Sequence, residues 1–450
     1  MLDVRRANSK LIILLGLLLL AGTEFVLRGP VRAVRSATQF NDFLSPYIQA
    51  NAWKLGLDPY GPETLLRLWP AGAAHFQFLP KEVADGTLIA QRGIPTAYPI
   101  TSLVLIAPFA FLPWSLAYAL WLVINLGLFL IMLRVLVELA GFSYRDPPAI
   151  LLLTATLALA PFHTGIVTGN VALVAVELGV IAVWTARKRH EITTAILIAV
   201  SAGLKPQIGL CFLLYCLVRR RWRISGIALA LLALLVAVGL FRLEFGHTPW
   251  LANYLNDNRV LLESGILANF TPVNPMRFGL INLQVILYSF VGSVRLTNDL
   301  AVSVGAILLV VWLIGTRRRA GNDLELLDLS AIAVISLLPV YHRFYDAALL
   351  VLPLCWVFIS FRRSRTIGIV SLLLILPFLI PGGTLLETMQ ADGHIPSAIV
   401  RHWWWDAVVM PHEIWALFLL SILLLYEMRR FVIPSRPSSL VIPAETSSRA

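Results

Sequence analysis

Residues 114–133 read WSLAYALWLVINLGLFLIML, a run of twenty positions without Asp, Glu, Lys or Arg. A helix needs about 20 apolar residues to cross the hydrocarbon core of a bilayer, so this run is long enough for one membrane-spanning helix. Similar apolar runs, several of them shorter, recur from Leu11 as far as Met428. Lipid offers no partner to an unpaired backbone group and the runs show no strand-like alternation, so they are predicted to be helices.

The composition of the whole chain indicates the same class. Hydrophobic residues make up 58% of the 450 residues and charged residues 14%, with a mean hydropathy of +0.80. That leaves too little polar surface to cover a soluble fold. We predict one all-α polytopic membrane domain over residues 1–433, with about 11–13 transmembrane helices. The Ser- and Pro-rich tail at 434–450 is predicted to be disordered and cytoplasmic.

The net charge of +11 would be compatible with nucleic-acid binding, but the distribution of the charge argues against that partner. The basic residues cluster between apolar runs, at Arg187–Arg189, Arg219–Arg223, Arg317–Arg319, Arg362–Arg365 and Arg429–Arg430. This is the pattern of short cytoplasmic loops. It predicts a multi-pass protein of a bacterial plasma (inner) membrane with both termini in the cytoplasm. Binding of lipid phosphates by some of these clusters is the alternative interpretation.

The first apolar segment, Leu11–Leu27, is predicted to be an uncleaved signal anchor, because basic residues precede it and no good cleavage site follows. The polar stretch at 28–97 then forms a large extracytoplasmic loop. Tyr98 is expected outside and Arg187 inside, which requires an odd number of membrane crossings, but the apolar segments between them are even in number. Either one segment is a half-helix that does not cross, or the loop at 134–147 faces outward.

The cysteine and carboxylate patterns predict neither a disulfide framework nor a metal site. Cys211, Cys216 and Cys355 all lie inside apolar runs, and no CxxC pair is present. The loop at 28–97 contains no Asp-x-Asp pair of the kind that holds the metal of a nucleotide-sugar enzyme. We therefore predict no metal and no cofactor.

Two carboxylates of the outer loop are candidates for a functional role. Asp42 is either the N-cap of a helix through Tyr47 or a general base that points into a cavity at the membrane surface. Asp58 lies in the sequence GLDPY, residues 56–60, where Gly and Asp-Pro are typical of a helix end followed by a turn.

Two polar groups between later apolar runs are predicted to lie on the same outer side. Lys205 precedes Pro206, which interrupts the helix and directs the ammonium group outward; it is either a ligand for an anion or a snorkelling lysine. His342 and Arg343 can bind a phosphate. Alternatively, Arg343 and Asp346 form an ion pair at a helix end.

These positions resemble a known family, the glycosyltransferase family 87 group of GT-C membrane enzymes, which are mannosyltransferase-like proteins that use polyprenyl-phosphate sugars. The resemblance covers roughly residues 10–360. It rests on the order of several short motifs: Asp42-Phe43 with Tyr47 and Asp58-Pro59-Tyr60, Tyr98-Pro99, Gly169-Asn170, Gly203–Pro206, and Pro339 with His342. The family commonly has Tyr-Pro-Pro at Tyr98–Ile100 and Gly-Gln at Gly169-Asn170, so this chain departs from the pattern at both places.

The resemblance implies a GT-C-like helical bundle with a catalytic carboxylate, Asp42, in the first outer loop. It also implies that Lys205, His342 and Arg343 bind the phosphate of the donor. The candidate residues of the substrate cavity are Tyr47, Asp58, Tyr60, Tyr98 and Asn170.

The implied reaction moves a mannose-like hexose from polyprenyl phosphate to a hydroxyl of a lipid or glycan acceptor at the outer membrane face, with inversion. The lipid-linked sugar is a co-substrate, and no metal is required. The alternative function is a transporter or flippase of lipid-linked sugars. A flippase is expected to show repeat symmetry and charged residues through the thickness of the bundle. Here the polar groups gather at segment ends, which favours the enzyme. A non-catalytic subunit of a cell-envelope complex is a third possibility.

Overall fold

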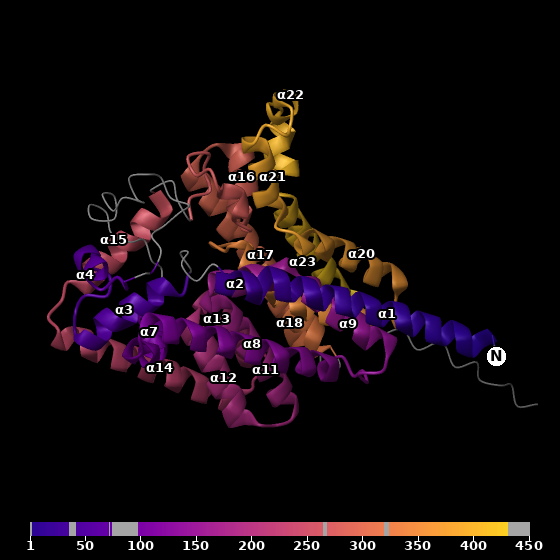
Figure 1. Ribbon diagram of the computed structural model, residues 1–450, viewed down its shortest axis with the longest axis horizontal. Helices are drawn as coiled ribbons and strands as arrows, with labels where there is room; N and C mark the ends of the chain where they lie inside the picture. The colour runs from indigo at the N-terminus through magenta and orange to yellow at the C-terminus, as the bar shows by residue number, and fades with distance from the viewer. Residues whose placement is uncertain are drawn as a thin grey trace, which may run out of the picture.

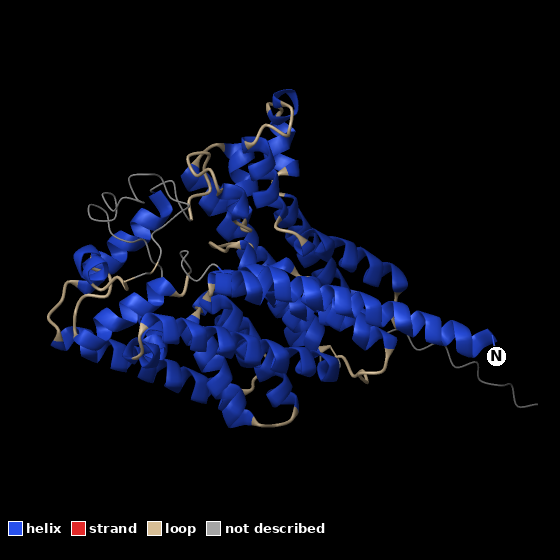
Figure 2. Cartoon of the chain, viewed as in Figure 1, coloured by secondary structure: helices blue, strands red, loops and turns tan. Residues whose placement is uncertain are grey.

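The structure is a computed structural model that describes residues 2–35, 42–71, 73, 98–263, 268–318 and 324–430. Within these ranges the chain forms helices joined by loops, and no strand is present among the described residues (Figure 2). The predicted all-α class is confirmed. The predicted tail at 434–450 and most of 61–97 lie outside the described residues.

The helices follow one another closely along the chain, and η marks a 3₁₀ or π turn (Figure 1). The first part contains α1 (Leu2–Val26), η1 (Leu27–Val31), α2 (Arg32–Arg35), α3 (Leu44–Leu55), α4 (Pro62–Arg67), α7 (Ile100–Ile106), η2 (Ala107–Phe111), α8 (Trp114–Leu139), α9 (Pro147–Ala158), α10 (Ala160–Thr168), α11 (Val171–Arg187), α12 (Glu191–Leu204), α13 (Pro206–Val218) and α14 (Trp222–Phe245). The second part contains α15 (Trp250–Glu263), η3 (Arg277–Gly279), α16 (Leu283–Val291), α17 (Val294–Arg318), α18 (Glu325–Ser336), η4 (Phe344–Leu350), α19 (Val351–Ser360), α20 (Arg365–Ile375), η5 (Leu376–Leu379), α21 (Gly382–Ala391), α22 (Ser397–Val400), η6 (Trp405–Val409) and α23 (His412–Arg430).

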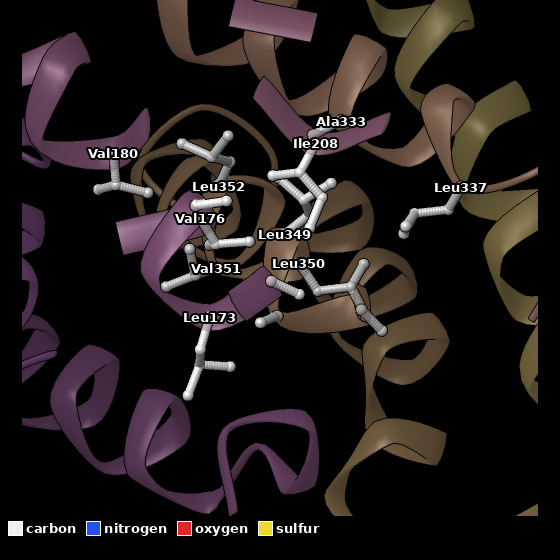
Figure 3. Close-up of a cluster of buried hydrophobic side chains, with 14 of the residues drawn as sticks. Leu173, Val176, Val180, Ile208, Ala333, Leu337, Leu349, Leu350, Val351 and Leu352 are labelled. Carbon is white, nitrogen blue, oxygen red and sulfur yellow. The ribbon is translucent and has the colours of Figure 1, made fainter. Parts of the chain in front are cut away.

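Helices α11, α13, α18 and the η4–α19 segment share an apolar core. Figure 3 shows part of it, with Leu173 and Val176 from α11, Ile208 from α13 and Leu349 from η4, all fully buried. Lipid tails are as apolar as these side chains, so in a bilayer the helices associate through close packing rather than through removal of surface from water. Gly209 at the α12–α13 contact illustrates this, because a Cβ there would collide with the backbone of Ala202.

One end of the bundle gathers the basic clusters, and we call it the arginine end. Arg187 at the end of α11 and Arg221 before α14 both pair with Glu325 at the start of α18, each at 2.9 Å. Arg187 also donates to the carbonyl of Leu139, the last residue of α8. Arg363 lies in the same region, where it lines a cavity together with Arg187 and Arg221. Clusters from distant loops thus share one side, as the positive-inside pattern requires.

The opposite end, which we call the Asp42 end, holds the loop before α3. The backbone N–H of Asp42 donates to the carbonyl of Thr168 at the end of α10. Helix α8 begins there, since Trp114 stacks on Phe43 with ring centroids 6.1 Å apart. Helices α8, α11 and α13 therefore run from the Asp42 end to the arginine end.

The segment formed by α7 and η2 does not run between the two ends. Tyr60 after α3 donates to the carbonyl of Tyr98 at 3.1 Å, and Tyr47 of α3 donates to that of Leu112 at 2.8 Å. Both termini of the segment thus lie beside α3. Glu138 near the end of α8 contacts Trp184 close to the arginine cluster of α11, so the loop at 134–147 does not belong to the Asp42 end. Of the two alternatives for this region, these contacts agree with the non-crossing segment.

Length and composition identify four helices of the described chain as candidate membrane spans, within Leu11–Arg35, Trp114–Leu139, Trp222–Phe245 and Val294–Arg318. Two bent pairs, Pro147–Thr168 and Arg365–Ala391, raise the number to six. This is fewer than the eleven to thirteen expected, because several apolar helices have only 10–17 residues. Apolar side chains such as Leu19 and Phe241 are more than 60% exposed, which fits contact with lipid.

Candidate functional site

The carboxylate of Asp42 is held by the start of α11. Gly169 ends α10 in the left-handed conformation, with φ 65°, and Asn170 follows as the N-cap of α11. The Oδ1 atom of Asn170 accepts from the N–H of Ala172 at 2.9 Å, and its Nδ2 donates to Oδ2 of Asp42 at 2.9 Å. One amide side chain thus both caps a helix and orients the predicted catalytic carboxylate.

Tyr98, in the chain segment before α7, contacts both Asn170 and Asp42. Its hydroxyl lies 3.4 Å from Nδ2 of Asn170 and 3.5 Å from the backbone carbonyl of Asp42. Burial raises the pKa of Tyr98 well above its usual value, and the negative charge of Asp42 raises it further. Tyr98 is therefore a neutral hydrogen-bonding group at this site, not a proton acceptor.

A second polar group lies where α12 and α13 are interrupted. Lys205 has an extended backbone between Leu204 and Pro206, and its Nζ pairs with Oδ1 of Asp346 at 2.6 Å. The side chain of Lys205 is only 12% exposed and that of Asp346 1%. An ammonium group this far from water requires an anionic partner. It also lies 5.0 Å from the ring centroid of Tyr345, a cation–π contact.

Asp346 accepts two further hydrogen bonds at its second oxygen. Nδ1 of His342 lies 3.0 Å from Oδ2, and the backbone N–H of Arg343 donates to the same atom at 3.0 Å. His342 is fully buried, and its Nε2 has no partner among the described residues. Arg343 and Asp346 thus meet at the start of η4 through the backbone of Arg343, and Lys205 forms an ion pair with Asp346.

Asp42 and the Arg343 region are close enough to act on each other electrostatically. Burial raises the pKa of Tyr341; the nearby Arg343 opposes this effect, while the charges of Asp346 and Asp42 reinforce it. Burial acts to lower the pKa of Arg343, but Tyr341, Tyr345 and Asp42 together raise it and so favour the charged guanidinium. The predicted site residues thus form two neighbouring groups: Asp42 with Tyr98 and Asn170, and Lys205, His342 and Arg343 around Asp346. We call this set the Asp42 site.

Tyr47 is not part of the Asp42 site. It is 6% exposed, packs against Trp114 at 5.2 Å between ring centroids, and uses its hydroxyl to bind the carbonyl of Leu112. In this position it fixes the non-crossing segment against α3. Although Tyr47 follows Asp42 by only five residues, its contacts in the described structure are packing contacts.

Asp58 and Tyr60 belong to a neighbouring group that includes helix α15. Oδ1 of Asp58 accepts from the N–H of Tyr60 at 2.9 Å, and Oδ2 accepts from Nδ2 of Asn253 at 2.6 Å. The rings of Tyr60 and Tyr254 contact each other at 4.9 Å between centroids. The hydroxyl of Tyr60 reaches the carbonyl of Tyr98, so this group borders the Asp42 site through one residue.

Sequence reasoning did not single out Asp257, which completes the group around Asp58. It is 1% exposed, and burial together with the charge of Asp58 raises its pKa to about 8. A signal was present, because Asn253 and Asp257 are four positions apart and therefore share one face of α15. Asp346 was considered only as an ion-pair partner, although it is the acceptor that joins Lys205, His342 and the backbone of Arg343.

No group of three or more His, Cys, Asp or Glu side chains in the described part of the chain is placed to hold a metal ion. The chemistry available from the described Asp42 site is that of one oriented carboxylate, the cations Lys205 and Arg343, and the hydroxyl of Tyr98. A carboxylate with cations across from it can accept a proton on one side and stabilise an anionic leaving group on the other.

Comparison with known families gives one match. The sequence model of glycosyltransferase family 87 matches residues 96–353. This range is shorter than the predicted resemblance over 10–360; it includes Tyr98, Asn170, Lys205 and Arg343 but not the loop that carries Asp42. Searches among curated proteins and among solved structures found no match. Since the matched range covers more than half of the chain, the protein belongs to glycosyltransferase family 87 and is a membrane glycosyltransferase.

Proposed function

We propose that this protein transfers a mannose-like hexose from a polyprenyl-phosphate donor to a hydroxyl group of a lipid or glycan acceptor. The reaction would take place at the Asp42 end, on the outer face of a bacterial plasma membrane, with the arginine end and both termini in the cytoplasm. The observation that carries the proposal is the position of Asp42, which Asn170 orients in a site that also contains Lys205 and Arg343.

In the proposed step, Asp42 accepts the proton of the acceptor hydroxyl as its oxygen attacks the anomeric carbon of the sugar. The new carbon–oxygen bond forms while the bond from the anomeric carbon to the phosphate oxygen breaks. The electron pair of that bond leaves with polyprenyl phosphate. A single displacement of this kind inverts the anomeric centre.

Lys205 and Arg343 are the residues that we assign to the donor phosphate. An ammonium group has three N–H donors, and the pair with Asp346 uses one of them, so Lys205 keeps donors for a phosphate oxygen. Arg343 presents a fork that suits a phosphate. Fully buried His342 is better placed to hold Asp346, and through it Lys205, than to touch the donor.

An apolar groove supports a lipid-linked donor. It has a volume of about 720 Å³ and lies between α9, α19, α20 and η5. One end reaches Leu159 and Leu379, close to η4, where Phe344 stacks on Phe378 with ring centroids 6.0 Å apart. A prenyl chain in this groove would stay within the hydrocarbon region while its phosphate approached the Asp42 site.

The proposal is tested by transfer of radiolabelled sugar from polyprenyl-phosphate-mannose, and from a small panel of related donors, in membranes that contain the protein. We expect wild type to form a labelled product and Asp42→Asn to reduce the rate by about 10²–10⁴-fold, the usual contribution of a general base. Asp392→Asn, which changes an exposed carboxylate between α21 and α22, is the matched control.

Full turnover by Asp42→Asn would exclude Asp42 as the base. If both proteins move the donor across the bilayer equally and neither transfers sugar, the flippase is the better explanation.

A further inference from the structure

A cavity at the arginine end, away from the Asp42 site, has no role in the proposed reaction. It has a volume of about 410 Å³ and lies where the ends of α8, α11 and α19 meet the starts of α18 and α20. Four arginines line it, namely Arg187, Arg189, Arg221 and Arg363, against two glutamates, Glu325 and Glu427. We call it the arginine cavity.

The charges in the arginine cavity do not cancel. Glu325, whose side chain is 1% exposed, forms ion pairs with both Arg187 and Arg221, each at 2.9 Å. Glu427 pairs with Arg430, a fifth arginine that does not line the cavity. With four guanidinium groups and two carboxylates around one space, a bound anion would be favoured. Arginine suits phosphate in particular, because its planar fork makes two parallel hydrogen bonds.

The backbone of Arg189 allows its side chain to be tested separately from the turn. Its φ is 62°, a left-handed conformation that a side chain disfavours and that glycine adopts readily at the end of a helix. The N–H groups of Arg189 and His190 bond back to Ala186 and Thr185, the usual pattern of such a helix end. Arg220 has the same kind of backbone, so the conformation itself does not show what the side chain of Arg189 does; it means that glycine can replace Arg189 without strain.

Apolar side chains also line the arginine cavity. Leu326, Leu327, Trp356 and Ile359 line it. A free anion in water would gain little from such walls. The glycerol and upper acyl carbons of a phospholipid would contact these side chains while the phosphate meets the arginines.

We propose that the arginine cavity binds the phosphate head group of an anionic phospholipid on the cytoplasmic side of the membrane. The site is separate from the Asp42 site and does not depend on the proposed transfer reaction. Its ligand is recognised by its phosphate and by its attachment to an apolar body.

The test compares Arg189→Gly with Arg220→Gly in the full-length protein. Arg220 is the matched control, because it has φ 56° in the turn between α13 and α14 but does not line the cavity. Both substitutions remove one positive charge at the arginine end, and both place glycine where the backbone favours it. Neither is therefore expected to lower the melting temperature, so a loss of binding would not reflect misfolding.

Binding is measured by native mass spectrometry of protein exchanged into mixtures of phosphatidylglycerol and phosphatidylcholine. We expect wild type and Arg220→Gly to retain phosphatidylglycerol in preference to phosphatidylcholine. We expect Arg189→Gly to bind phosphatidylglycerol at least five-fold more weakly than Arg220→Gly does. The double variant Arg189→Gly/Arg363→Gln is expected to lose the preference altogether.

Three results would overturn the proposal. Equal losses in Arg189→Gly and Arg220→Gly would mean that the lipid responds to the charge of the whole surface. If wild type shows no preference for phosphatidylglycerol, an anionic phospholipid is excluded as the ligand. Displacement of the lipid by millimolar inorganic pyrophosphate, with the same dependence on Arg189, would show that a soluble phosphate compound is the occupant.

Discussion

At the scale of single residues, Asn170 links the fold to the proposed chemistry. Its side-chain oxygen caps α11, while its side-chain nitrogen holds Asp42. The two tasks can be separated by substitution, because serine is a good N-cap but cannot replace the amide donor to Asp42 at the same distance.

We expect Asn170→Ser to change the free energy of unfolding by less than about 0.5 kcal/mol and to lower the transfer rate roughly ten-fold. Asn170→Ala should lower the rate similarly and also cost about 1 kcal/mol of stability through loss of the cap. Thermal melts and initial transfer rates of the two variants check this. Unchanged rates in Asn170→Ser would mean that Asp42 does not need the amide to be oriented.

Asp257 is a residue whose protonation is linked to stability. In the folded protein burial and the charge of Asp58 raise its pKa to about 8, whereas in the unfolded chain an Asp titrates near about 3.9. Between these values the folded protein holds a proton that the unfolded chain has released. The free energy of unfolding therefore falls as the pH rises from about 4 to about 8.

We expect the melting temperature of wild type to fall between pH 6 and pH 9 by more than that of Asp257→Asn, which resembles the protonated acid and does not titrate. Asp392→Asn, at an exposed position, should behave as wild type. Parallel pH profiles for all three proteins would contradict the assignment of the titration to Asp257.

At the scale of the helices, the pair between Lys205 and Asp346 ties the α12–α13 break to η4. Removal of one partner leaves a mostly buried charge, whereas removal of both leaves none. We expect Asp346→Asn to cost about 3–5 kcal/mol and Lys205→Met/Asp346→Asn to cost clearly less than the sum of the two single variants. Denaturation of the four proteins of this double-mutant cycle measures the coupling, and strictly additive losses would mean that the pair is not formed.

The contact between α12 and α13 depends on the absence of a side chain at Gly209. A Cβ at this position would collide with the backbone of Ala202, while a Cβ on Gly226 of α14 would meet nothing within 4 Å. We expect Gly209→Ala to destabilise the protein by about 1–3 kcal/mol. Gly226→Ala should stabilise it by about 0.5–1 kcal/mol, because alanine is the better helix former. Melting temperatures that shift in the same direction would contradict this helix contact.

At the scale of the whole molecule, the gathering of basic clusters at one end predicts how the protein is oriented in the membrane. The three native cysteines are buried, so an introduced cysteine can be labelled selectively. Asp392 follows α21, whose Glu387 accepts from the N–H of Phe278 close to the Leu280–Arg343 bridge, so it lies on the side of the Asp42 site. We expect a membrane-impermeant maleimide to label Asp392→Cys in intact cells. Arg318→Cys, at the arginine end of α17, should be labelled only after permeabilisation. Labelling of both variants in intact cells would exclude the proposed orientation.

The amino-acid sequence was sufficient for the class of protein, the position of the basic loops and the family. These properties depend on composition, on hydropathy within single segments and on the order of short motifs. Asp42, Tyr98, Asn170, Lys205, His342 and Arg343 were each identified from such local features. Local features could not show that Tyr47 packs against the non-crossing segment or that Asp257 lies beside Asp58.

Only the tertiary structure decided which of these side chains meet. Asn170 and Asp42 are 128 positions apart in the chain, and Lys205 and Asp346 are 141 apart. Their contacts depend on how the helix ends pack, and hydropathy records only how much of a segment is apolar, not which ends adjoin. A cation such as Lys205 in an apolar surrounding must find an anion, so the sequence predicted the need for a partner, and the packing of η4 against the α12–α13 break selected Asp346.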